Sequence, residues 1–227
     1  MARTPRTARP GTTDGIAVIG LGRFGGAVAE SLLQLGHDVL GIDESAELVQ
    51  QWSDRLTHVV QADATNGETL RSLGVHDFRH AIVGIGTDIE ASVLTVLALD
   101  DLGVPDIWAK ALSIKHGRIL ERTGAHHVIY PEASMGERVA HLVTGKMIDF
   151  IELEDGYAIV KTRAPAAAVG RTLAQCGWRS EHGVTVVGIK RLRGGFEAGL
   201  PDSVIRQGDL LIVAGETKQV EAFAAGT

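Results

Sequence analysis

The sequence predicts an α/β protein, with a doubly wound parallel sheet covered by helices and then a small α+β domain. Three observations lead to this fold class. Short β-branched runs alternate with longer helical stretches from residue 16 to about residue 130, as in parallel sheets with helices on both faces. A glycine-rich turn directly follows the first run. After residue 146 the alternation gives way to short strands separated by turns.

Six strands are expected in the first domain, at residues 16–19, 38–42, 58–61, 81–84, 107–109 and 127–130. Three helices are expected to begin at capping boxes, in which a hydroxyl and a carboxylate satisfy free backbone N–H groups: Thr65 with Glu68, Thr87 with Glu90, and Ser134 with Glu137. Four glycines are expected to close helices with a positive φ: Gly36, Gly74, Gly103 and Gly124.

The chain is expected to divide into four segments. Residues 1–14 form a disordered tail, 15–134 the first domain, 135–147 a connecting helix and 148–227 the C-terminal domain. Around the second domain, strands are expected at 147–153, 157–164, 183–191 and 209–215, and short helices at 169–177 and 217–225. A hairpin and a loop are expected between the last two strands.

Composition excludes several functional classes. The formal net charge is −6 and the basic residues are scattered, so no extended nucleic-acid footprint is expected. A single cysteine, Cys176, can form neither an internal disulfide nor a thiolate metal site, and we expect it to be a small buried side chain in a reducing cytoplasm. No apolar run approaches the roughly 20 residues that cross a bilayer.

The glycine-rich turn predicts a nucleotide site. Gly20, Gly22 and Gly25 form a G-x-G-x-x-G pattern between a strand and a helix, and Asp43 follows eighteen residues after the last glycine. In a Rossmann-like domain the first glycine allows a tight turn, the second a close approach of backbone to phosphate, and the third a helix close to the sheet. Asp43 would accept hydrogen bonds from a ribose and repel a 2′-phosphate, which disfavours NADP.

Two charged residues are unusual in such a site. Arg23 lies in the first turn of a helix, where a cation opposes the helix dipole unless an anion is near, so we expect it to contact phosphates. Glu132 lies at the carboxyl ends of the strands, where phosphates would repel it unless it faces away or a divalent cation joins the two.

The sequence shows no convincing catalytic pair. His182 is the one histidine after residue 147, and no G-x-x-x-x-G-K-[ST] loop is present, so we expect the protein not to be an enzyme. The helix after Gly86 is apolar on more than one side, which predicts either a subunit interface or a deeply buried helix.

Several of these stretches together resemble a known family. "VIGLGRFGGAVAESLLQLGHDVLGID", "VVQADAT", "IVGIGTDIEASVLTVLALDDLGVPDIWAK" and "GAHHVIYPEASMGERVA" are similar to the RCK domain of Ktr and Trk potassium-uptake regulatory subunits, especially the KtrA type. The resemblance covers residues 14–222, and its C-terminal part rests on the strand pattern rather than on specific motifs.

The resemblance implies a cytoplasmic ring, an octamer built from dimers, that gates a membrane potassium-translocating subunit (KtrB- or TrkH-like) from the inner face of the membrane. In KtrA-like members ATP favours the active form and ADP the inactive form, whereas Trk-type relatives also respond to NAD and NADH. Some members bind cyclic di-AMP at the C-terminal dimer interface, but its contacts have no residue-level match in this sequence.

The resemblance also implies roles for individual residues. Arg23, followed by Phe24 in "GRFGG", would contact the terminal phosphates, and Glu132 would reach a neighbouring subunit's nucleotide and support Mg²⁺ or Ca²⁺. The remaining site residues are the ribose contacts Asp43, Glu44 and Ser45, the adenine contacts Asp63 and Ala64, the floor residues Ile85, Gly86 and Thr87, and the opposite wall of Lys110, Ala111, Leu112 and His116.

One departure from the family pattern keeps alternatives open. "QADAT" places Asp63 where KtrA-like members often have asparagine, which adds negative charge beside the nucleotide. An NAD(H)-sensing Trk-type regulatory subunit is therefore the alternative to an ATP/ADP sensor. A soluble NAD-dependent oxidoreductase is the rival from another class, and it would need a substrate pocket and a catalytic base in the second domain.

Overall fold

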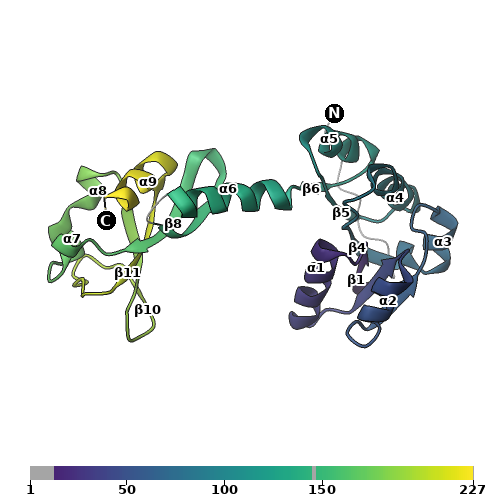
Figure 1. Ribbon diagram of the computed structural model, residues 1–227, viewed down its shortest axis with the longest axis horizontal. Helices are drawn as coiled ribbons and strands as arrows, with labels where there is room; N and C mark the ends of the chain where they lie inside the picture. The colour runs from purple at the N-terminus through teal and green to yellow at the C-terminus, as the bar shows by residue number, and fades with distance from the viewer. Residues whose placement is uncertain (1–12, 145–146, 227) are drawn as a thin grey trace. The chain divides into compact units, whose positions relative to one another are not determined.

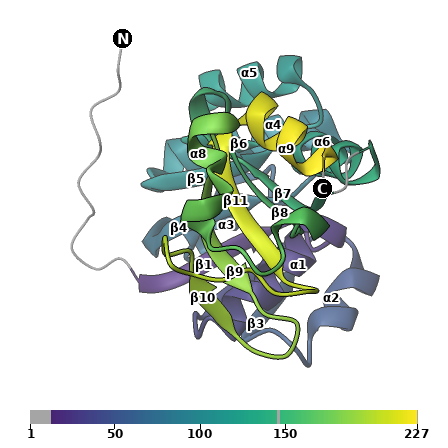
Figure 2. The ribbon, with the colours of Figure 1, turned by 90° about the vertical axis from the view of Figure 1, so that its left-hand side faces the viewer.

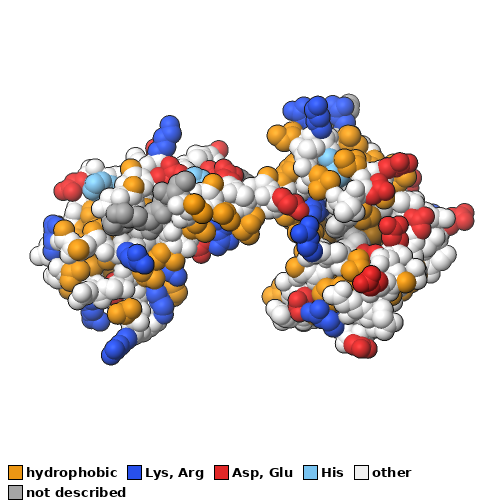
Figure 3. Space-filling view, in the orientation of Figure 1, with side chains coloured by type: hydrophobic (Ala, Val, Ile, Leu, Met, Phe, Trp, Pro, Cys, Tyr) orange, Lys and Arg blue, Asp and Glu red, His pale blue; other side chains and the backbone are white. Residues whose placement is uncertain are grey.

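A computed structural model describes residues 13–144 and 147–226. The chain forms two compact units that divide between Glu132 and Ala133 (Figure 1). Among the described residues, no helix is both long and apolar enough to cross a membrane. Hydrophobic side chains are exposed at several places on the surface of both units (Figure 3).

The first unit contains a six-stranded parallel sheet in the order β3-β2-β1-β4-β5-β6. This is the doubly wound arrangement that the sequence predicts, and its strand order reverses between β1 and β4. The strands are β1 (Thr13–Ile19), β2 (Val39–Asp43), β3 (His58–Gln61), β4 (Phe78–Val83), β5 (Asp106–Lys110) and β6 (His127–Ile129). All six expected strands are thus present, with ends that differ by three residues or fewer.

Helices cover both faces of this sheet. They are α1 (Arg23–Gln34), α2 (Ala46–Trp52), α3 (Gly67–Ser72), α4 (Ile89–Leu102) and α5 (Ile114–Thr123), with a short 3₁₀ turn η1 (Val75–Asp77) before β4. Alternate residues of β1 serve the two cores, because successive side chains of a strand point to opposite faces. Val18 packs with α1 and α2, whereas Ile19 packs with α3, α4 and α5.

Two expected capping boxes are wrong, each by one residue. Asn66 caps α3, its side chain accepting from the N–H groups of Glu68 and Thr69 at 2.9 and 3.3 Å, and Asp88 caps α4 by accepting from Ala91 at 2.9 Å. In both places the threonine expected to cap the helix is followed directly by Asn or Asp, and these two residue types cap helices at least as well as threonine. The four glycines expected to end helices all have positive φ, between 73° and 123°.

The connecting helix also differs from the expectation. Helix α6 spans Pro131–Thr144 and strand β7 begins at Met147, so the helix starts and ends earlier than residues 135–147. Proline suits the first turn of a helix because its missing N–H would have no partner there, and Ser134 therefore lies inside the helix and does not cap it. Strand β1 begins at Thr13, and the rest of the expected tail, residues 1–12, lies outside the described residues.

The second unit contains an antiparallel sheet in the order β10-β9-β11-β8-β7, against which α9 packs on β8 and β11 (Figure 2). Its elements are β7 (Met147–Glu152), η2 (Glu154–Gly156), β8 (Tyr157–Arg163), η3 (Ala166–Ala168), α7 (Leu173–Cys176), α8 (Trp178–Glu181), β9 (Thr185–Lys190), β10 (Phe196–Ala198), β11 (Leu210–Glu216) and α9 (Thr217–Ala225). The expected hairpin is confirmed as β9–β10, and Cys176 is buried as expected.

Candidate nucleotide site

The glycine-rich loop lies at the point where the strand order reverses, between β1, β4 and the start of α1. Gly20 has a φ of +87°, which L side chains rarely adopt. A Cβ on Gly25 would lie 1.8 Å from the carbonyl oxygen of Gly20, so α1 can approach the sheet only because residue 25 has no side chain. These are the structural roles that the sequence predicts for the first and third glycines.

Gly22 differs from its neighbours because nothing in the described protein requires a glycine there. It has a φ of −63°, and a Cβ at this position would have no neighbour within 4 Å. It is also the N-cap of α1, where no side chain caps the helix and no acidic residue lies in the first turn. The helix N-terminus therefore offers free N–H groups and a positive dipole end beside open space, which suits an anion.

Three residues that the sequence analysis missed help to hold this loop. The indole Nε1 of Trp52 donates to the carbonyl oxygen of Leu21 at 3.2 Å, and a Cβ on Gly26 would lie 2.5 Å from the Trp52 ring. A Cβ on Gly84 would lie 2.9 Å from the Gly20 carbonyl oxygen. The second glycine of "FGG" and the glycine after β4 were visible in the sequence, but their partners come from distant parts of the chain.

Asp43 is buried and joins the loop to the next helix. Its Oδ2 accepts from the N–H of Leu21 at 2.6 Å, and its Oδ1 accepts from the N–H of Ser45 at 2.8 Å. Each carboxylate oxygen can accept a further hydrogen bond, so a ribose contact remains compatible with this geometry. Ser45 caps α2 by accepting from the N–H of Leu48, and Glu44 is exposed.

Two of the expected lining residues have their side chains in the core. Ala64, expected at the adenine, and Ala111, expected at the opposite wall, are both buried in the cluster under α3, α4 and α5. The N–H of Ala111 is already bonded to the carbonyl oxygen of Ile129 at 2.8 Å. By contrast Asp63 is exposed, and hydrogen bonds from the hydroxyl and N–H of Thr65 hold the pKa of its carboxyl below the usual value.

Lys110 and Glu132 form an ion pair at the carboxyl end of β5. The Lys110 ammonium lies 2.5 Å from Glu132 Oε1, and the two side chains are 10% and 63% exposed. The ammonium also lies 5.7 Å from the centre of the Phe24 ring, and a Cβ on Gly86 would lie 3.0 Å from it. The hydrogen bond from Lys110 lowers the pKa of Glu132, and the charge of Arg23 lowers it further. The structure thus brings Lys110, Glu132, Arg23, Phe24 and Gly86 together.

The other two residues of the β4–α4 loop extend this rim. Ile85 is half-buried, packs against the core and lies beside Gly20, whereas Thr87 is exposed. Leu112, on the loop after β5, is exposed as well, and its N–H donates to His116 Nδ1 at 3.3 Å.

His116 is buried, with one ring nitrogen unsatisfied. Because Nδ1 accepts from Leu112, a neutral ring carries its proton on Nε2, and that atom is buried without a partner in the described residues. Burial lowers the pKa of His116, which favours the neutral ring. A buried donor without an acceptor is costly, so an acceptor supplied by a ligand or a water would stabilise this position.

The described residues contain no group of three or more His, Cys, Asp and Glu side chains that could hold a metal ion. Glu132 is the acid of this site that the resemblance assigns to a cation, and its carboxylate is bonded to Lys110. A divalent cation at Glu132 would therefore need phosphate oxygens, water or a second chain for its remaining ligands.

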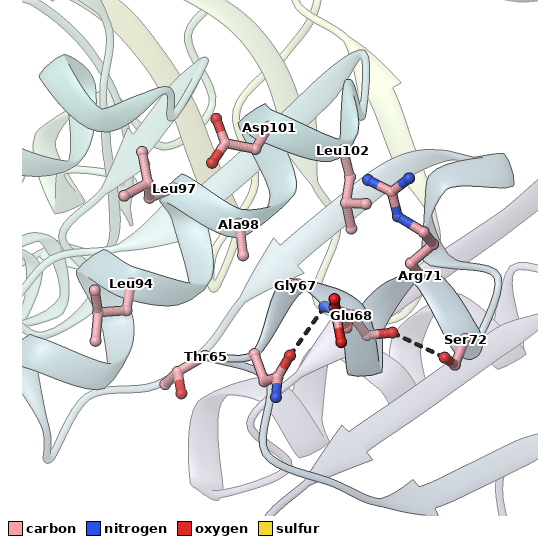
Figure 4. A pocket seen from close by; sticks show the side chains of 11 residues that line it. Thr65, Gly67, Glu68, Arg71, Ser72, Leu94, Leu97, Ala98, Asp101 and Leu102 are labelled. Atoms are coloured by element: carbon pink, nitrogen blue, oxygen red, sulfur yellow. Dashed lines mark hydrogen bonds between the residues drawn. The ribbon is translucent and has the colours of Figure 1, made fainter.

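A groove of about 770 Å³ lies between α3 and α4 (Figure 4), and its lining includes no residue of the glycine-rich loop. Leu94 and Leu97 of α4 line one side of it, and Glu68 and Arg71 of α3 line the other. Both leucines are exposed, as is Ile89 at the start of the helix. Of the two alternatives for the apolar surplus of α4, complete burial is therefore wrong on this flank.

Comparison with known proteins defines the class. The chain matches the family models of the TrkA-N domain over residues 16–131 and the TrkA-C domain over residues 157–225. Two solved structures with similar folds are the RCK domain of GsuK (TM-score 0.67, 19% identity, 100% of this chain and 51% of that one) and the GsuK channel bound to NAD (TM-score 0.66, 19% identity, 99% and 42%). The fold is therefore that of a two-domain RCK protein.

The particular family follows from a curated relative. The chain is 37% identical over 208 residues to the Ktr system potassium uptake protein A of Bacillus subtilis. The aligned residues cover 91% of this chain and 94% of that protein. The chain thus belongs to the Ktr and Trk family of RCK-domain potassium uptake proteins, and the resemblance inferred from its motifs is confirmed.

Acidification should destabilise the fold through His116. In the unfolded chain the ring takes up a proton near its ordinary pKa of 6.5, whereas the folded pKa lies lower, so folding stability falls as the pH drops below that value. Denaturant unfolding at pH 7.5 and 5.5 should show a smaller loss for His116→Gln than for the wild type. The exposed His37→Gln serves as control, and equal losses in the wild type and His116→Gln would contradict the assignment.

Proposed function

We propose that this chain is the nucleotide-sensing regulatory subunit of a Ktr-type potassium uptake system. Its relative is named a Ktr potassium uptake protein, and its own cationic site supports binding of a phosphorylated ligand. In this proposal the protein assembles as a ring of dimers in the cytoplasm and gates a potassium-translocating membrane subunit. The proposal assigns it no catalytic residue.

The observation that carries the proposal is the convergence of positive charge on open space at Gly22. The N-terminus of α1 has no cap, Arg23 lies in its first turn, and Lys110 is held nearby against Phe24. A helix N-terminus alone suits a diphosphate, and two further cations favour a ligand with more negative charge. We therefore favour ATP and ADP as ligands over NAD.

A ligand switches a protein only by binding two conformations unequally. The terminal phosphate of ATP can supply this difference through Arg23 and through Mg²⁺ or Ca²⁺ bridged to Glu132, and ADP lacks that phosphate. We propose that ATP with a divalent cation favours the active form of the ring and that ADP favours the inactive form.

A specific observation supports NAD(H) as the alternative ligand. A structural neighbour, the GsuK channel, is described as bound to NAD, and Asp43 suits the ribose of either class of nucleotide. Mass spectrometry of the nucleotide that copurifies with the chain, followed by titration of ATP, ADP, NAD and NADH, distinguishes an ATP/ADP sensor from an NAD(H) sensor.

Removal of the Arg23 side chain should weaken the binding of ATP far more than the binding of ADP. For Arg23→Ala we expect the Kd of ATP to rise by roughly ten- to a hundredfold, about 1.4 to 2.7 kcal/mol, and that of ADP to change little. Isothermal titration measures both, and Arg79→Ala, an exposed arginine near the start of β4, is the matched control. Equal losses for the two nucleotides would refute a contact to the terminal phosphate.

The two glycines should respond differently to a side chain. Gly22→Val should keep the free energy of unfolding within about 1 kcal/mol of the wild type, because its Cβ has open space, yet it should block nucleotide binding. Gly25→Ala should cost roughly 3 kcal/mol or more, because its Cβ overlaps the Gly20 carbonyl. Denaturant unfolding and titration test both, and a Gly22→Val protein that binds ATP normally would count against the site.

The ring should depend on the exposed face of α4. We propose that a second copy covers Leu94 and Leu97, so Leu94→Glu with Leu97→Glu should reduce the molar mass measured by light scattering after size exclusion. Leu35→Glu, at an exposed leucine beyond the end of α1, should leave the mass unchanged. An unaltered assembly in the α4 variant would place the interface elsewhere.

A further inference from the structure

Helix α6 belongs to both units of the chain. It begins at Pro131, Glu132 is the last residue of the first unit, and the helix continues to Thr144. Beyond its first turn, α6 is attached to the second unit: Arg138 lies 2.5 Å from Asp149, and His141 lies 2.8 Å from Glu221 and stacks on Phe150 at 4.1 Å. A helix that is built into the second unit thus starts at the edge of the nucleotide site.

At its other end, the first turn of α6 is attached to the site through Glu132 and Lys110. Lys110 is the more constrained partner, because its side chain is 10% exposed and a cation removed from water needs an anion beside it. Among the described residues, Glu132 is the carboxylate within 4.0 Å of that ammonium. Glu132 itself is 63% exposed and can turn into water at little cost.

Building on the proposed function, we propose that the Lys110–Glu132 ion pair is a latch that nucleotide phosphate opens. A phosphate beside Lys110 takes the place of Glu132 as counter-charge to the ammonium, and the first turn of α6 is then released from β5. Two like charges on one ammonium repel each other, so the phosphate and the carboxylate compete.

The released carboxylate keeps a favourable place on its own helix. An acidic side chain in the first turn is stabilised by the helix dipole, so the exchange does not unfold α6. Free of Lys110, Glu132 becomes available to a divalent cation. One carboxylate therefore has two partners, Lys110 in the empty site and a cation in the loaded one.

Hydrogen exchange of the full chain tests the latch, with ADP in EDTA as the probe. In the wild type, saturating ADP should speed exchange of the amides of residues 135–138 by roughly two- to fivefold, the range that partly exposed ion pairs support. In Glu132→Gln, the same amides should exchange at this faster rate without ADP, and adding ADP should not change the rate. Without ADP, the effects of Lys110→Gln and Glu132→Gln on the exchange rate should be non-additive in the double variant, because both remove the same ion pair. If Glu132 acted only through the helix dipole, the two effects would add.

The Arg138–Asp149 pair is the matched control, since it has the same 2.5 Å distance on the same helix away from the site. Arg138→Gln should speed exchange equally with and without ADP. If titration shows that ADP binds the wild type but the α6 amides do not respond, or if the single variants are additive, the latch is refuted and the proposed function stands. If neither ATP nor ADP binds the wild type, both proposals fail.

Discussion

The close approach of α1 to the sheet is the constraint on which the candidate site depends. It requires three positions without side chains, at Gly25 against the Gly20 carbonyl, at Gly84 directly after β4 and at Gly26 against Trp52. Only with the helix in this position does its uncapped N-terminus face the loop and Arg23 lie beside it. The same geometry lets the N–H of Leu21 reach Asp43, which connects the loop to α2.

Charge then determines how such a site can work. Helix N-terminus, Arg23 and Lys110 all favour an anion, and in the chain by itself Glu132 provides one. In the proposed latch, a ligand phosphate takes the place of Glu132 beside Lys110, so the ligand exchanges one anion for another at a site that is already formed. Because Glu132 lies on α6 and this helix continues into the second unit, we propose that the exchange acts on an element of both units.

The sequence predicted most of the fold because β-branched runs and terminal glycines are local signals, as in β3, which spans His58–Gln61 as expected. It failed where two candidates for one role stand side by side, as at Thr65 and Asn66 before α3. The choice between them depends on backbone angles that the pattern does not contain. Trp52 was missed for a related reason, because its contact with Leu21 joins residues 31 positions apart.

By itself, then, the sequence determined the class of fold, the glycine-rich turn and the family, since each is written in the order and spacing of residues. Tertiary structure decided which of the expected site residues meet. It buried the side chains of Ala64 and Ala111 in the core and brought Lys110 to Glu132, 22 residues further along. The physical reason is that burial and charge pairing depend on neighbours in space, and only the folded sheet brings the ends of distant strands to one edge.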